Sequence, residues 1–263
     1  MWSEVHEVIL RQDRIVVLSG LAAITALSWV YVFSLASDMQ SMNMGDMGTQ
    51  MTLPRMQAWG VAEFTLTFGM WAVMMVAMMT PSAAPMILMF AAVNRRRRKQ
   101  EVSYIPTSVF LAGYLVVWAA FSVMATAAQW GLHAASLLSP MMASTSPVLG
   151  GILLVAAGTY QWTPLKHACL SKCRSPMGFV LNEWREGRWG AFLMGLKHGG
   201  YCTGCCWSLM ALLFVAGIMN LLWVAAIAGF VLLEKVAPGG DQLCRVAGVV
   251  LVGWGVWMVA GVL

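Results

Sequence analysis

The chain has 263 residues, of which 60% are hydrophobic and 10% are charged, and its mean hydropathy is +0.73. A soluble domain carries about 25% charged residues, so this composition excludes an ordinary soluble protein and indicates an integral membrane protein. The net charge is +5. The basic residues cluster between apolar segments, which is typical of topology signals and gives no support to a nucleic-acid-binding face.

Apolar segments follow one another along the chain and are separated by polar or charged stretches. The first is long enough to cross a bilayer, although Ser-Leu-Ala-Ser near its end leaves a cleaved signal peptide as an alternative. Pro81 and Pro85 are expected to kink the second span or to end its regular part. The spans predicted are 15–36, 61–92, 105–128, 148–160, 190–217, 220–233 and a last one that ends at Leu263.

The distribution of charge predicts the orientation of these spans. With the N-terminus inside, only Arg55 of the 16 Lys and Arg falls outside, and only Lys197 falls within a span, as the positive-inside rule expects. We therefore predict an all-α, polytopic transmembrane bundle of about seven spans, N-in and C-out, in a bacterial inner membrane. Residues 1–263 form one domain, with an irregular Met-rich extracytoplasmic loop at 37–60 and a cytoplasmic Cys-containing loop at 165–188.

The fifth span contains an unusual group of soft side chains. On a helix, His198, Cys202, Cys205 and Cys206 share an arc of about 100°. Thiolate and imidazole on one stripe suit Cu(I), Zn(II) or iron. The alternative is that small Cys and Gly residues only pack against neighbouring helices. That explains one cysteine better than three, so we favour a metal site.

A second pair of thiols, Cys169 and Cys173, lies before the fifth span, with His167 close by. The C-x₃-C spacing puts both thiols on one side of a helix, and the flanking basic residues favour thiolate. A metal station or a reactive thiol pair fits this pattern. Two ordinary cytosolic thiols are the alternative.

Methionine is over-represented, with 22 residues. Thioethers bind Cu(I), but they also fill irregular cores. On the second span, a methionine face and the preceding loop together form a candidate relay for the metal, with packing and a plain linker as the alternatives. The residues concerned are Met70, Met74, Met75, Met78 and Met79 on the span, and Met39, Met42, Met44 and Met47 in the loop.

Three charged residues lie within or at the ends of the apolar spans: Lys197, Glu234 and Lys235. Charges at this depth are costly and are often functional. We consider a gating role for them, with an ion pair at the inner face as the simpler reading.

Several motifs together resemble the bacterial predicted metal-binding integral membrane proteins, a family of unknown function sometimes labelled copper chaperone. They are Met74 to Ser82 (Met-Met-x₂-Met-Met-x-Pro-Ser), Tyr160 to Lys166 with Cys169, Cys173 and Pro176, and Gly195-x₂-His198-Gly199-x₂-Cys202-x-Gly204-Cys205-Cys206-Trp207. The resemblance reaches from the second span to about Lys235. It implies a polytopic bundle with a metal site and no settled reaction.

Three functions follow. The favoured one is a membrane protein that binds, delivers or transfers a soft metal ion, with copper favoured and zinc or iron as alternatives, and with a metal donor or acceptor protein as partner. The second is a transmembrane thiol–disulfide redox carrier, and the third is an assembly subunit of a larger membrane complex. No Ser-His-Asp arrangement or nucleotide-binding loop is present in the sequence, so a binding protein is favoured over an enzyme.

Overall fold

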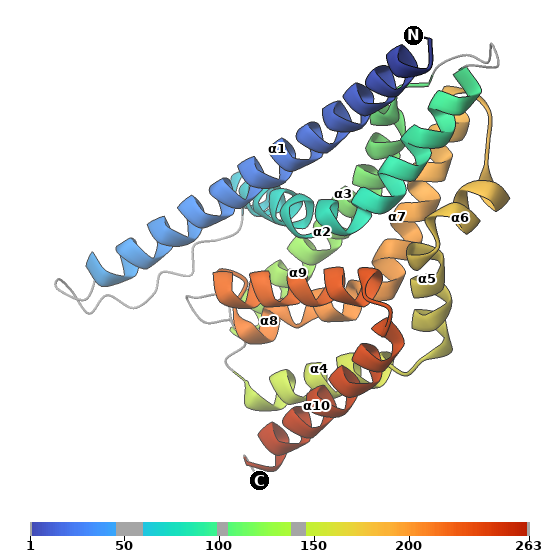
Figure 1. The fold of residues 1–263 in the computed structure, drawn as a ribbon. Coiled ribbons are helices and arrows are strands. Elements are labelled where there is room, and N and C mark those ends of the chain that lie inside the picture. The colour runs from blue at the N-terminus through green and yellow to red at the C-terminus, as the bar shows by residue number, and fades with distance from the viewer. Residues whose placement is uncertain (1, 46–59, 99–104, 138–145, 262–263) are drawn as a thin grey trace.

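The structure is a computed structural model that describes residues 2–45, 60–98, 105–137 and 146–261. Within these ranges every regular element is a helix, which confirms the all-α prediction (Figure 1). The helices are α1 (Trp2–Gly45), α2 (Val61–Arg98), α3 (Thr107–Ala134), α4 (Pro147–Tyr160), α5 (Pro164–Arg174), α6 (Pro176–Glu183), α7 (Gly187–Ala211), α8 (Leu213–Ala216), α9 (Leu221–Val236) and α10 (Gly240–Ala260).

Five described segments are long and apolar enough to cross a membrane: Arg14–Asp38, Val61–Arg97, Thr107–Ala134, Gly187–Ala216 and Gly240–Ala260. The helices α4 and α5 meet the same test only as a pair bent by 64°, which would make six spans. The count of about seven and the N-in orientation therefore stay predictions.

Two segments that we predicted as loops contain helix. α1 continues to Gly45, so the first part of the predicted 37–60 loop is helical, while 46–59 lie outside the described residues. The expected loop at 165–188 contains most of α5 and all of α6. Pro164 and Pro176 each occupy the first turn of these helices, where the missing N–H costs nothing. The Thr163 hydroxyl caps α5 by accepting a hydrogen bond from the Lys166 amide at 3.3 Å.

α2 continues through Pro81 and Pro85 rather than ending there. A proline inside a helix lacks the N–H that would bond four residues back, so Pro81 leaves the carbonyl of Ala77 without its usual donor. The indole Nε1 of Trp29 on α1 donates to this carbonyl at 3.1 Å. This contact satisfies a backbone group away from water and fixes α1 against α2.

α3 and α7 pack closely because glycine backbones face each other. A Cβ at Gly113 would lie 2.2 Å from the carbonyl oxygen of Phe192, and one at Gly195 would lie 2.0 Å from that of Phe110. Small residues permit such approach between membrane helices. This packing brings Tyr114 of α3 against α7.

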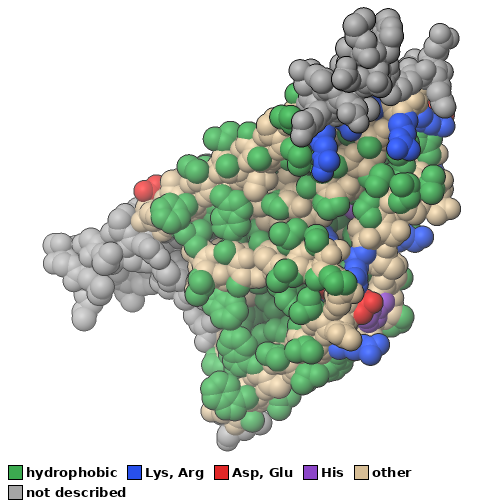
Figure 2. Space-filling view, viewed as in Figure 1, with side chains coloured by type: hydrophobic (Ala, Val, Ile, Leu, Met, Phe, Trp, Pro, Cys, Tyr) green, Lys and Arg blue, Asp and Glu red, His purple; other side chains and the backbone are tan. Residues whose placement is uncertain are grey.

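The charged side chains gather at one part of the surface. Figure 2 shows Lys and Arg along the edge formed by α5, α6 and the end of α2, whereas the remainder of this face is largely hydrophobic. α5 lies on this edge and also packs against α7 (Figure 1). The short helix therefore joins the charged edge to the helix that contains three of the six cysteines.

Candidate metal site

α7 presents the predicted soft side chains to the interior. The helix is unbroken from Gly187 to Ala211, so the glycines of the motif do not unwind it. His198 is 2% exposed, and Cys202, Cys205 and Cys206 are fully buried. Sulfur side chains at this depth contact other side chains of the protein and do not contact water.

A fourth thiol comes from α5. α5 packs on α7, and this packing puts the Cys173 thiol close enough to Cys202 and Cys205 to influence them electrostatically. The thiols of Cys205 and Cys206 donate to the carbonyl oxygen of Cys202 at 3.1 and 2.9 Å. We call these four residues the thiol cluster. The sequence analysis treated Cys169 and Cys173 as a second, separate pair of thiols, whereas the packing of α5 on α7 brings Cys173 beside the α7 cysteines.

Cys169 lies one turn before Cys173 and is only half-buried. Its Sγ occupies the space above Gly204, 2.8 Å from where a Cβ would lie. Any larger residue at position 204 would displace this thiol. Cys169 is therefore the more accessible neighbour of the thiol cluster.

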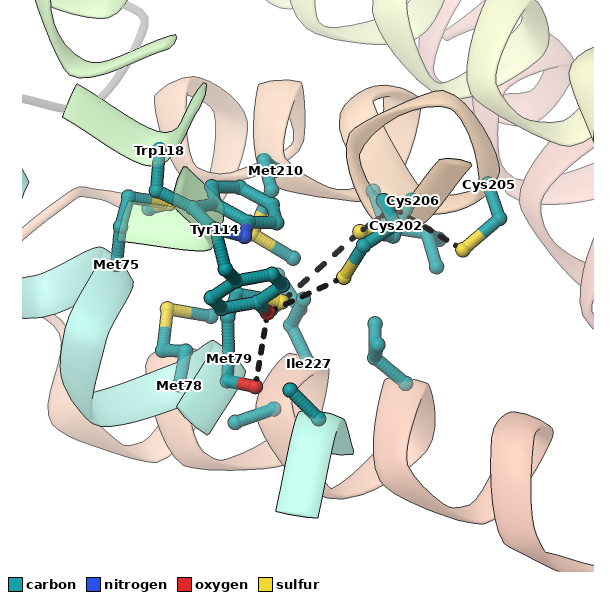
Figure 3. Close-up of a cluster of buried hydrophobic side chains, with 14 of the residues drawn as sticks. Met75, Met78, Met79, Tyr114, Trp118, Cys202, Cys205, Cys206, Met210 and Ile227 are labelled. Carbon is teal, nitrogen blue, oxygen red and sulfur yellow. Dashed lines mark hydrogen bonds between the residues drawn. The ribbon is translucent and has the colours of Figure 1, made fainter. Parts of the chain in front are cut away.

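Tyr114 and Met79 close the cluster on the side of α2 and α3 (Figure 3). The Tyr114 hydroxyl lies 3.1 Å from the carbonyl oxygen of Met79, to which it donates, and 3.3 Å from the Sγ of Cys202. The Met79 thioether lies 3.9 Å from the Sγ of Cys206. A soft thioether thus adjoins the thiols.

Lys235 approaches the cluster from α9. Its ammonium lies 2.9 Å from the Sγ of Cys202 and 3.0 Å from the hydroxyl of Ser82. The side chain is 8% exposed. A cation at this distance favours the thiolate form of a cysteine.

The neighbouring residue, Glu234, takes part in a separate polar group. It forms a buried ion pair with Lys166 of α5, which also donates to Gln161, and the Cys244 thiol donates to Glu234 at 2.6 Å. We considered a pairing of Glu234 with Lys235 at the inner face. The structure instead gives each of them its own partners, because successive helix residues point about 100° apart.

The His198 ring is surrounded by aromatic side chains, one of which, Tyr114, also lies against Cys202. Its ring stacks on Phe110 and Tyr114 and meets Phe179 edge-on, with centroid separations of 6.1, 5.6 and 5.6 Å. Neither ring nitrogen has a hydrogen-bond partner among the described residues. An unpartnered buried imidazole is available to a ligand.

Two predicted residues lie away from the cluster. His167 is partly exposed, and its Nδ1 lies 3.7 Å from Asp241 at the surface. Lys197 is exposed and pairs with Glu183 at 2.5 Å, so the ion-pair reading fits it better than a buried gate.

The methionines of α2 are buried as a group, with exposed fractions of 6% or less for Met70, Met74, Met75, Met78 and Met79. Their side chains pack in the core together with the α7 cysteines, and the Met79 thioether lies 3.9 Å from the Sγ of Cys206. Met39, Met42 and Met44 fall on the last turns of α1, while Met47 lies outside the described residues. The relay through the others stays a prediction.

Sequence reasoning missed Tyr114, Lys166 and Cys244. Tyr114 was detectable as a hydroxyl in the middle of an apolar span. Lys166 and Cys244 were detectable only through their common partner, Glu234, because nothing in their sequence spacing connects them.

The described residues contain no group of three or more His, Cys, Asp or Glu side chains that could hold a metal ion as they stand. The structure offers instead buried thiols on two helices that pack together, with a thioether and an imidazole nearby. Soft thiolate and thioether donors suit Cu(I), and thiolates also bind zinc and iron–sulfur clusters. The fit therefore depends on two thiols and their soft neighbours rather than on the full predicted set.

Comparison with known proteins adds one finding. No curated protein and no solved structure matches the chain. Residues 68–258, well over half of the chain, match the family model PpoB2, described as copper chaperone. This range includes the thiol cluster, Met79, His198 and Lys235, and the description points to copper handling. The chain belongs to the PpoB2 copper chaperone family.

Proposed function

We propose that this protein binds Cu(I) inside its helix bundle and passes it to or from another protein in a bacterial inner membrane. The observation that supports this most is the packing of α5 on α7, which buries Cys173 beside Cys202 and Cys205. A family description that names copper and a thioether 3.9 Å from Cys206 favour Cu(I) over harder ions. In this proposal copper is cargo.

Within this proposal, the residues have different roles. Cys173 and Cys202 hold the ion between the two helices, with Cys205, Cys206 and His198 as further ligands during transfer. Cys169, which is half-buried on α5, is the station that a cytoplasmic partner reaches. Met79 is the member of the α2 methionine face that connects with the cluster, and the Met-rich segment serves the outer approach.

The test is copper binding by the purified protein in detergent under reducing conditions. We expect Cys173→Ser/Cys202→Ser to lose bound Cu(I) or to weaken its affinity by at least about a hundredfold, because one mutated outer-shell partner alone can cost 10–100-fold. Cys244→Ser is the matched control. Its thiol is also buried, but it bonds to Glu234 on the other side of α9. Unchanged copper affinity in the double variant would end the proposal.

The second candidate, a thiol–disulfide carrier, needs the same contact between Cys173 and Cys202 or Cys205. All six cysteines are free thiols in the structure. Electron transfer by metal-free protein, with a mixed disulfide trapped on Cys169, would favour this candidate. Copper binding that depends on Cys173 and Cys202 favours the first.

A further inference from the structure

Lys235 is a buried cation for which the described part of the chain provides no acidic partner. Its ammonium contacts the Ser82 hydroxyl and the Cys202 sulfur, and the side chain is 8% exposed. Among the described residues no carboxylate lies within ion-pair distance of it. Burying a charge is costly unless an opposite charge accompanies it, so an anion has to be supplied from the groups that surround Lys235.

The nearest carboxylate is already used. Glu234 precedes Lys235 on α9, but it pairs with the ammonium of Lys166 and accepts from Cys244. Lys166, like Glu234, is almost completely buried, at 0% and 1% exposed. The pair is therefore neutral by itself, and one positive charge is left over on the side of α9 that faces the thiol cluster.

The sulfur nearest to Lys235 is that of Cys202, 2.9 Å from its ammonium, and the other three thiols of the cluster are close enough to interact with its charge. We propose that Lys235 is the fixed counter-charge of the metal site and makes it select a monovalent soft cation over a divalent one. This inference rests on the proposed function.

The selection follows from counting charges. A monovalent ion between two thiolates forms a unit with one net negative charge, which Lys235 cancels. A divalent ion between the same two thiolates forms a neutral unit, and Lys235 is then left unbalanced in a medium of low dielectric constant. Both ions would bind the same sulfur ligands, so Lys235 distinguishes them by their charge and not by the softness of the ligands.

The test compares metals of both charges on wild type, Lys235→Met and Lys235→Gln in detergent, by competition with chelators of known affinity. Cu(I) and Ag(I) represent monovalent ions, and Zn(II) and Cd(II) represent divalent ions. Lys235→Gln keeps a hydrogen-bonding group beside Ser82 and Cys202 without the charge. Lys197→Met is the matched control, because it removes one positive charge from an exposed lysine paired with Glu183.

We expect wild type to prefer Ag(I) over Cd(II), two ions that both bind thiolates, and we expect this preference to fall by about tenfold or more in both Lys235 variants. Cu(I) against Zn(II) should change in the same direction, and Lys197→Met should leave both ratios unchanged. If wild type binds monovalent ions through Cys173 and Cys202, and a folded Lys235 variant has the same ratio of Ag(I) to Cd(II) affinity, this inference alone is overturned. A wild-type preference for Cd(II) overturns it without any variant. Wild type that binds neither metal charge overturns the proposed function instead.

Discussion

Replacing Gly195 by alanine should push α3 and α7 apart, whereas the same change at Gly200 should not. A Cβ at position 195 would lie 2.0 Å from the carbonyl oxygen of Phe110, and ordinary contact begins at 3.4 Å, so the two helices have to separate by about 1.4 Å. The obstacle is backbone and cannot rotate away. At Gly200, on the same helix, a Cβ meets nothing within 4 Å.

Two effects of opposite sign decide the magnitude. Alanine is favoured over glycine in a helix by about 1 kcal/mol, and both variants gain this. Overpacking a well-filled contact costs about 1–3 kcal/mol, and only Gly195→Ala pays it. We therefore expect Gly200→Ala to be up to about 1 kcal/mol more stable than wild type, and Gly195→Ala to lie about 1–3 kcal/mol below Gly200→Ala.

The assay is reversible unfolding in mixed micelles, with Cu(I) affinity measured on the same samples. The separation of α3 from α7 also moves Tyr114 away from Cys202, which are now 3.3 Å apart, so the copper affinity of Gly195→Ala should change as well. Equal unfolding free energies for the two alanine variants would refute the close approach of α3 and α7.

Three further changes test separate contacts. Trp29→Phe removes the donor to the carbonyl that Pro81 frees and should lower the unfolding free energy by about 1–3 kcal/mol; an unchanged thermal midpoint would contradict it. Glu234→Gln leaves the Lys166 charge unpaired and should cost about 3–5 kcal/mol, while Lys166→Met/Glu234→Met should recover most of this; equal stability of both variants would argue against a buried pair. Tyr114→Phe should cost about 1 kcal/mol and keep full copper stoichiometry, because the phenol packs on Cys202 rather than binding metal; a lost copper equivalent would show otherwise.

The features of the fold that could be predicted from the sequence are those set by local composition. Apolar runs of sufficient length give helices such as α3 and α10 almost directly. The burial of the α7 stripe follows from its helical spacing, since His198, Cys202, Cys205 and Cys206 recur on one face. These properties depend on neighbours in sequence, and no other part of the chain has to be known.

The contacts between distant segments could not be predicted in this way. Cys173 meets Cys202 because α5 turns by 64° from α4 and then packs on α7, and neither the bend nor the packing follows from C-x₃-C spacing. The same holds for Glu234 and Lys235, whose adjacency suggested one ion pair. Their different partners come from α2, α5, α7 and α10, and the choice among these depends on tertiary packing.

The placement of the interacting thiols on two separate helices, α5 and α7, has a mechanical consequence for any cargo they share. An ion bound by thiols of both helices would crosslink α5 to α7. Metal binding and the ordering of α5 would then be thermodynamically coupled, so each favours the other. Backbone amides of α5 should then exchange hydrogen more slowly once copper is loaded. By the same coupling, a recipient protein that separates α5 from α7 would lower the affinity of the site for copper and so promote its transfer.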